Sequence, residues 1–296
     1  MKLIDAHHHV WRRADLSWLD GEPVPRIFGP YEPIRRDYVA EEYAEEAHAA
    51  GIDASVYVQA NWPLERSVEE VAWVHAEHER TGWPMAIVGS ADLFDDGVQA
   101  TFDAQLETSP LMRGTRLQLH WHDNPTFRFA SAPDRMRDPV FRRNVGRLAA
   151  LDWVFELQVF SPQMEDAAEL VAEHPDVTFV LVHAGMLEDT EVETMRRWRA
   201  GMARLAEQPN VIVKLTGQGT FVHRVDEGLL RLVARECLNL FGPTRLMFGT
   251  NFPVEKLWTD METLVSAWRR VIADEAGDDA HHLLADTARR VYRLDV

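Results

Sequence analysis

The sequence predicts an α/β protein, a single (β/α)8 TIM barrel formed by residues 1–296. Three observations predict this fold. Short apolar, β-rich segments alternate with helical segments along the whole chain, which indicates parallel strands joined by crossover helices. Eight such units in 296 residues fit a closed barrel better than an open sheet. No G-x-G-x-x-G turn follows an early strand, which weakens the doubly wound alternative.

The expected strands share β-branched or aromatic residues bounded by turn signals; they are residues 3–9, 54–61, 85–91, 114–120, 153–159, 178–183, 211–216 and 245–251. Helical periodicity is expected at 38–50, 67–81, 139–150, 163–173 and 226–241. Two closing helices, 260–273 and 281–291, are expected to complete the outer ring. Long loops are expected at 12–33, 122–137 and 186–196.

Composition excludes several classes of partner. Hydrophobic residues make up 46% and charged residues 27%, an ordinary balance for a soluble protein. The formal charge of −17 argues against nucleic acid and against an anionic membrane surface. Cys237 is the only cysteine, so no intrachain disulfide forms, and its apolar flanks predict a buried structural thiol. With no spanning segment or signal peptide, we expect a cytoplasmic protein.

Alternation along each strand predicts which side chains enter the barrel. We expect apolar residues such as Ile4, Ala6, Val56 and Val58 to face the helices. His183 is expected to point inward because it alternates with Val182. The expected inward set is polar: Asp5, His7, His9, Tyr57, Gln59, Asn61, Arg116, Gln118, His120, Glu156, Gln158, His183, Lys214, Thr216 and Asn251.

Polar residues concentrate where the strands end. Seven of them close strands: His9, Asn61, His120, Gln158, His183, Thr216 and Asn251. The active sites of barrel enzymes are assembled at the carboxyl ends of their strands, whereas a purely structural lumen would be Val, Ile and Leu throughout. The pattern therefore predicts an enzyme acting on a small molecule.

The H-x-H pair formed by His7 and His9 places two imidazoles on one face of a strand, close enough to bind one divalent cation. His8 should point the other way and has no expected role. His183 is a candidate third ligand or a proton carrier, with a satisfied core histidine as the alternative.

Other polar residues near the strand ends are candidates for substrate binding. His120 belongs to a second H-x-H pair, for which substrate contact is favoured over metal, while the role of His122 stays open. Arg116 and Lys214 lie deeper, where an ion pair with Asp5 or Glu156 is the alternative to substrate contact. Trp258, at the catalytic mouth, could form a wall of the pocket or simply pack in its loop.

Two segments carry a resemblance to a known family. Residues 4–11 (IDAHHHVW) and 247–254 (MFGTNFPV) resemble the amidohydrolase superfamily, and most closely its amidohydrolase-related branch of L-fuconolactonase-like lactone hydrolases. The segments VHAG (182–185) and KLTG (214–217) fall where that branch has later strand ends. The resemblance implies a barrel of the amidohydrolase type in which His7 and His9 form the metal pair and His183 is the later histidine.

The chain departs from the family at the end of its last strand. The family carries a carboxylate there that activates water, and this chain has Asn251, whose carboxamide cannot accept a proton. The lysine or glutamate bridge and the extra histidine of binuclear members are also missing. The resemblance therefore implies at most a mononuclear site, with Zn²⁺ or Mn²⁺ as candidates, and extends to members that act without metal.

Together these features predict a hydrolase that opens a small sugar- or carboxylate-bearing lactone with water activated at the histidine site. Asn251 would orient water or substrate, and the proton would pass to His183 or Glu255, although Glu255 could instead pair with Lys256 or Arg245. The expected substrate contacts are Asn61, Arg116, His120, Gln158, Lys214 and Trp258. Alternatives are a metal-dependent decarboxylase or hydratase, and a non-catalytic ligand-binding barrel. A homodimer is a further expectation.

Overall fold

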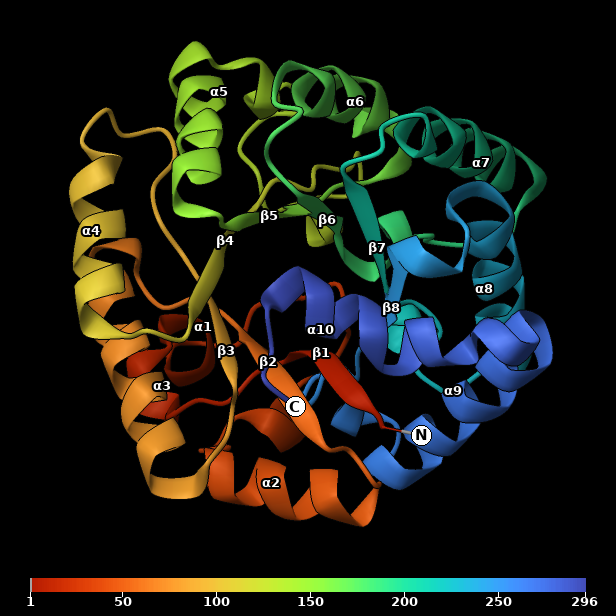
Figure 1. Ribbon diagram of the computed structural model, residues 1–296, viewed down its shortest axis with the longest axis horizontal. Helices are drawn as coiled ribbons and strands as arrows, with labels where there is room; N and C mark the ends of the chain where they lie inside the picture. Colours follow the sequence, from red (N-terminus) through yellow and green to blue (C-terminus); the bar gives the residue numbers. More distant parts are fainter. Residues whose placement is uncertain (1) are drawn as a thin grey trace.

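The computed structural model describes residues 2–296 and contains one sheet of eight parallel strands in sequential order, which confirms the predicted barrel (Figure 1). The strands are β1 (Ile4–His8), β2 (Ala54–Val58), β3 (Ala86–Gly89), β4 (Met112–Gln118), β5 (Val154–Gln158), β6 (Phe179–Leu181), β7 (Val211–Leu215) and β8 (Leu246–Phe248). Backbone hydrogen bonds join the first and last strands at their carboxyl ends, from Asn251 to His7 and from His9 to Phe252, both 2.7 Å.

Helices surround the strands (Figure 1). They are α1 (Ser17–Asp20), α2 (Ala40–Ala49), α3 (Ser67–Thr81), α4 (Val98–Thr108), α5 (Pro139–Gly146), α6 (Met164–Glu173), α7 (Val192–Ala206), α8 (Glu227–Phe241), α9 (Met261–Ala276) and α10 (Thr287–Tyr292). The sequence did not predict α4, and α7 begins inside the segment expected to be a loop. Helix α7 forms because Met195, Trp198, Met202 and Leu205 share its buried face at helical spacing. No helix within residues 2–296 is long and apolar enough to cross a membrane.

Two apolar clusters show which way the strand residues point. One cluster joins residues from seven strands, which is feasible only inside the barrel; it includes Ile4, Ala6, Val56, Val58, Val88, Val154, Val180, Ile212 and Met247. The other lies between strands and helices and includes Tyr57, Phe155, Leu157, Leu181, Val213 and Phe248.

The predicted orientation is therefore confirmed for β5 and β7, and it is wrong for residues 4–6 of β1 and residues 56–58 of β2. Ile4, Ala6, Val56 and Val58 point inward, and Tyr57 points outward, where its hydroxyl donates to Glu70 of α3. The strands of a parallel barrel are buried on both faces, so apolar character does not distinguish the lumen from the helix side.

Strand β1 also departs from simple alternation. Its register with β2 shifts between Asp5 and His8. Asp5 faces outward, where it accepts hydrogen bonds from Tyr43 of α2 and from Thr250. His8 also faces outward, stacked on Tyr43, with no place in the lumen as expected. The irregularity lets His7 and His9 reach the interior although Ile4 and Ala6 already face it.

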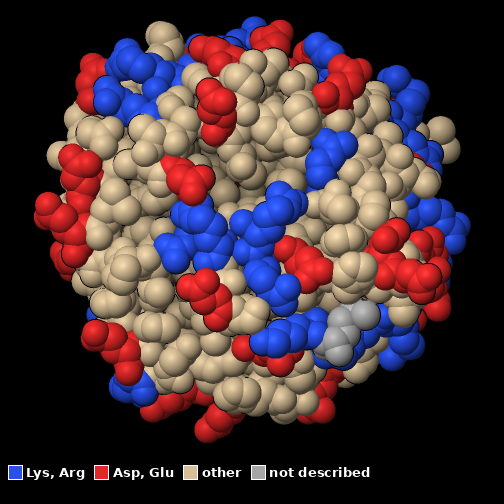
Figure 2. Space-filling view, in the orientation of Figure 1, with Lys and Arg blue, Asp and Glu red and all other residues tan. Residues whose placement is uncertain are grey.

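Helix α10 closes the amino-terminal end of the barrel and does not join the outer ring, contrary to expectation. Ala288, Val291 and Tyr292 belong to the luminal cluster, and the Tyr292 hydroxyl donates to Glu156 at 2.7 Å. In Figure 1, α10 lies across the middle of the ring. Figure 2 shows the same face, where Lys and Arg side chains gather near the centre among scattered acidic groups.

Candidate active site

Three imidazoles meet at the carboxyl ends of the strands. The ring of His7 lies 5.1 Å from the ring of His9 and 5.0 Å from that of His183, measured between centroids. His9 donates from Nδ1 to the carbonyl of Val58 at 2.6 Å, which fixes its tautomer. His183 donates from Nδ1 to the carbonyl of Thr216 at 3.2 Å. In both rings Nε2 is the nitrogen left to bind a ligand.

His183 reaches the site through a turn of the backbone. Strand β6 ends at Leu181, and His183 and Ala184 then take left-handed conformations with φ of 55° and 48°. Val180 faces the lumen, so continued alternation would have turned His183 away from it. The prediction that His183 points inward agrees with the structure, but the reason given for it was wrong. Asn61 and Asn251 each lie three residues past the end of their strand and take the same left-handed conformation, with φ of 64° and 59°.

Glycine is required beside two of these histidines. A Cβ atom on Gly249 would lie 2.8 Å from Cβ of His7, so only glycine lets the end of β8 approach β1. A Cβ on Gly217, whose φ is 73°, would lie 2.4 Å from Nδ1 of His183. The GTN and LTG segments singled out in the sequence therefore position the imidazoles.

Beneath His7 lies a buried ion pair. The ammonium of Lys214 donates to Glu156 at 2.5 Å, and both side chains are fully buried. Lys214 also lies 3.5 Å from Nδ1 of His7. Burial lowers the pKa of Lys214 to about 8, although Glu156 opposes the shift. Of the two roles left open for Lys214, the structure shows the ion pair with Glu156, and Lys214 does not line the pocket.

The electrostatic surroundings keep the three imidazoles neutral. Burial lowers the pKa of His7, His9 and His183 well below the usual range, and the nearby charges of Arg116 and Lys214 lower it further. Nε2 of His7 is buried and has no hydrogen-bond partner within the described chain. Neutral imidazoles with free nitrogens are the form that binds a divalent cation, so these residues fit a mononuclear metal.

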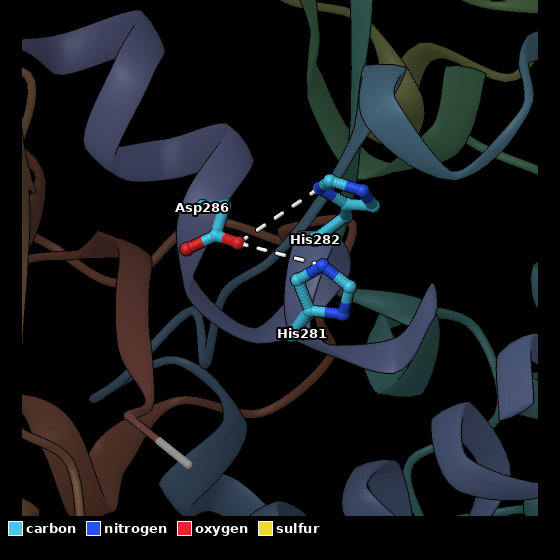
Figure 3. A group of neighbouring side chains, drawn as sticks. All are labelled: His281, His282 and Asp286. Atoms are coloured by element: carbon cyan, nitrogen blue, oxygen red, sulfur yellow. Dashed lines mark ion pairs between the residues drawn. The ribbon is translucent and has the colours of Figure 1, made fainter. Parts of the chain in front are cut away.

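The nitrogen atoms of His7, His9 and His183 are farther apart than the ligand atoms of a site in which all three residues bind one ion. Within residues 2–296, three candidate ligand atoms lie within 4.8 Å of one another only at His281, His282 and Asp286. Figure 3 shows both of those imidazoles turned toward the carboxylate of Asp286. This cluster is partly exposed, lies beside α10 away from the pocket, and shares Asp286 with Arg289. It must be controlled for whenever bound metal is counted.

A pocket of about 890 Å³, including its open mouth, lies above the histidines. The predicted site residues that line it are His9, Asn61, Arg116, His120, Gln158, His183 and Asn251. Residues from the loops after β1, β4 and β7 complete the wall and were not predicted: Trp11, Trp18, Arg26, Phe28, Arg128, Phe129 and Phe221. His7 lies below this surface, and His122 does not line it.

Glu255 and Trp258 stand behind the pocket wall and do not line it. The indole of Trp258 donates to Glu255 at 2.7 Å, and Oε1 of Glu255 has no partner of good geometry within the described chain. Burial raises the pKa of Glu255 to about 8, opposed by Trp258 and by the amide of Asn251. The alternative prediction, an ion pair between Glu255 and Lys256 or Arg245, is wrong. Lys256 pairs with Glu42 and Glu46 instead, and Arg245 donates to backbone carbonyls.

A parallel (β/α)8 barrel whose strand ends bring neutral imidazoles together is the architecture of a barrel enzyme with a metal-binding site. The chain belongs to the amidohydrolase family: the family described as Amidohydrolase matches residues 4–294. It is therefore a hydrolase of this superfamily, as the two marker segments predicted.

Curated relatives resemble the chain over nearly its whole length. The uncharacterized protein y4mH of Sinorhizobium fredii is 28% identical, covering 99% of this chain and 98% of the relative. An L-fucono-1,5-lactonase of Burkholderia multivorans is 30% identical, covering 98% and 96%. A crystal structure of an amidohydrolase from Burkholderia multivorans with bound zinc superimposes with a TM-score of 0.83 at 28% identity, covering 99% and 100%.

Proposed function

We propose that this protein is a lactonase that adds water to a small cyclic ester in the pocket above His7, His9 and His183. One observation carries the proposal: neutral imidazoles from β1 and from the end of β6 converge beneath an open pocket, and Nε2 of His7 is buried with no hydrogen-bond partner among residues 2–296. The relatives named as L-fucono-1,5-lactonases, at 27–30% identity, support the choice of a lactone over an amide.

His7 and His9 are the residues proposed to hold a divalent cation, with zinc favoured by the zinc-bound relative. When bound, such a cation supplies Lewis acidity and lowers the pKa of water toward about 7. His183 lines the pocket 5.0 Å from His7, and its Nδ1 is occupied by Thr216. Its Nε2 can therefore accept the proton from water and return it to the leaving oxygen.

Asn251 lines the pocket and cannot act as a base, so its amide is proposed to orient the substrate. Glu255, protonated at neutral pH and held by Trp258, lies behind that amide and is proposed to position it. Asn61, His120 and Gln158 supply hydrogen bonds to the ring substituents, since each lines the pocket. His120 is neutral because burial lowers its pKa to about 3.

The experiment is a pH-indicator screen of sugar and aromatic lactones with the wild-type protein, combined with elemental analysis. His7→Ala should abolish turnover and remove bound metal. His183→Asn should abolish turnover and retain the metal, because the proposed roles differ. A His281→Ala/His282→Ala variant is the matched control, and its activity should equal that of the wild type. Unchanged rates in His7→Ala would contradict the site.

A further inference from the structure

Two histidines and one aspartate converge just before α10, outside the pocket. Nε2 of His281 lies 3.7 Å and Nδ1 of His282 lies 3.9 Å from the same oxygen, Oδ2 of Asp286. Figure 3 shows both rings turned toward that carboxylate. The next residue, Thr287, donates to the carbonyl of Thr244, which precedes β8, so the cluster lies at the amino-terminal end of the barrel.

The separations are close to those between the ligands of one metal ion. A tetrahedral Zn²⁺ with ligands at about 2.0–2.1 Å holds neighbouring ligand atoms about 3.3 Å apart. The two observed distances, 3.7 and 3.9 Å, exceed this value by only about half an ångström. The side chains of His281, His282 and Asp286 are all partly exposed, so small rotations can close the difference and water can complete the coordination shell.

Hydrogen bonds outside the cluster orient its ligand atoms. Nδ1 of His281 donates to the carbonyl of Asp278 at 2.8 Å, so Nε2 of the neutral ring carries the lone pair that faces Asp286. A hydrogen bond from the other ring nitrogen to a carbonyl is the usual second contact of a metal-bound histidine. Arg289 donates to Oδ1 of Asp286 at 2.7 Å, and Oδ2 is left to face the two rings.

The backbone winding brings both histidines to the same carboxylate. Residues His282–Asp286 form one turn of π-helix. In an α-helix with 3.6 residues per turn, residues five apart point about 140° away from each other, so His281 and Asp286 would diverge. The wider π turn, with its i→i+5 bonds, reduces that angle, and such turns inside helices are frequent at functional sites.

The turn is fixed to the barrel by its inner side. Leu283 and Leu284 belong to the cluster between strands and helices, and Ala285 belongs to the luminal cluster. The three ligand candidates therefore stand on a rigid support, which is what a preorganised metal site needs.

The local charge favours a cation. Residues 274–288 carry five carboxylates and no lysine or arginine. Asp274 and Glu275 are paired with arginines of α8. Asp278, Asp279 and Asp286 remain, and Arg289 offsets only one of them. The surroundings of the two imidazoles are therefore negative before an ion binds.

We propose that His281, His282 and Asp286 form a structural metal site that binds one Zn²⁺. Two imidazole nitrogens among three ligands favour zinc over Mg²⁺ and Ca²⁺, which prefer oxygen. None of the three residues lines the pocket, so the ion serves the fold and takes no part in the reaction. It links the residue before the π turn to the last residue of that turn, directly before α10 (Thr287–Tyr292), and so stabilises the helix whose Tyr292 donates to Glu156.

The test counts bound zinc and measures thermal unfolding of the full chain after removal of metal with a chelator. Equilibrium dialysis against ZnCl2 should show one zinc fewer per chain in a His281→Ala/His282→Ala variant than in the wild type. Asp286→Asn should weaken zinc binding at this site at least 10-fold, because changes that only reorient a ligand already cost 10- to 100-fold. Zinc at about 100 times its Kd for the site should raise the unfolding midpoint of the wild type by about 4–8 °C more than that of the double variant.

His75→Ala is the matched control. Nε2 of His75 lies 3.7 Å from Glu79, the same distance as in the cluster, but its neighbour His78 directs Nδ1 to the carbonyl of Pro84. One imidazole and one carboxylate do not make a comparable site, so this variant should bind as much zinc as the wild type. Circular dichroism shows whether each variant is folded.

A His7→Ala/His9→Ala background separates this site from the pocket. In that background the further replacement of His281 and His282 should remove one zinc per chain, whether or not the protein hydrolyses a lactone. Equal zinc counts with and without His281 and His282 would overturn the inference. A midpoint shift of the same size with MgCl2 as with ZnCl2 would also overturn it, because imidazoles would then contribute nothing to the binding.

Discussion

Replacing Glu156 with Gln tests the buried ion pair between Glu156 and Lys214 beneath the candidate active site. Glu156 accepts hydrogen bonds from Lys214 at 2.5 Å and Tyr292 at 2.7 Å, and all three side chains are fully buried. The substitution keeps the shape and removes the charge, so the ammonium of Lys214 loses its counter-ion. Breaking one side of a buried ion pair costs about 3–5 kcal/mol. The cost has an upper limit, because Lys214 can become neutral by releasing its proton. For a lysine with an ordinary pKa of 10.5, deprotonation at pH 7 costs about 1.4 kcal/mol for each pH unit below the pKa, or about 5 kcal/mol in all.

The assay is thermal unfolding followed by circular dichroism at several pH values. A loss of 3–5 kcal/mol lowers the unfolding midpoint by roughly 6–20 °C in a chain of this size. The pKa of Lys214 is about 8 in the folded wild type and 10.5 when unfolded, so the ammonium and its pairing are lost as pH rises through 8. The difference between variant and wild type should therefore shrink between pH 7 and pH 9.5.

Two further variants make this test specific. Tyr292→Phe removes only a neutral donor and should cost about 0.5–1.5 kcal/mol. Lys214→Met combined with Glu156→Leu removes both charges and should recover most of the lost stability. A loss below about 1 kcal/mol for Glu156→Gln, or a loss that does not change with pH, would refute this account of the pair.

Three other predictions follow from the site and the core. If the proposed lactonase function holds, Asn251→Asp should change the rate or the metal affinity without being required for turnover. Activity that appears only in this variant, in a lactone screen, would instead identify the wild type as a non-catalytic barrel. Glu255→Gln should remove a pH dependence of the free energy of unfolding. The pKa of Glu255 is about 8 in the folded protein and 4.5 when unfolded, so folding favours the protonated acid. This contribution to stability is fully present below pH 4.5 and is lost as the pH rises through 8. The variant should therefore unfold at a higher temperature than the wild type at pH 9, and an equal or lower midpoint would contradict the raised pKa. Cys237 is buried and its pKa lies far above the usual range, so an aromatic disulfide reagent should label it only after denaturation, and rapid labelling of the native protein would contradict its burial.

The sequence predicted the barrel well because strand-helix alternation is a long-range pattern repeated eight times. It predicted the faces of the first two strands poorly, because Ile4 and Val56 are as apolar as residues that pack on helices. His183 shows the same limit: its inward position depends on a left-handed turn after β6, which periodicity does not report. Asn61 and Asn251 carried a usable signal, since asparagine tolerates that conformation better than most residues.

Residues contributed by loops were the main omission at the site. Arg26 and Arg128 lie in segments that were expected to be long loops, and neither belongs to a strand whose direction could be inferred. The arginine and aromatic lining of the pocket could be seen in the sequence only as arginines that lie close to tryptophans and phenylalanines. Their convergence on one pocket depends on how the loops after β1 and β4 fold over the barrel, which is a tertiary property.

Helix α10 connects a late segment of the chain with the histidine motif near its beginning. Tyr292 holds Glu156, Glu156 holds Lys214, and Lys214 lies against His7, so four residues from distant parts of the chain form one column through the barrel. A ribosome releases His7 long before it makes Tyr292. Until Tyr292 is made and α10 has packed, Glu156 lacks one of its two hydrogen-bond donors, and Lys214 beneath His7 is paired with a less restrained carboxylate.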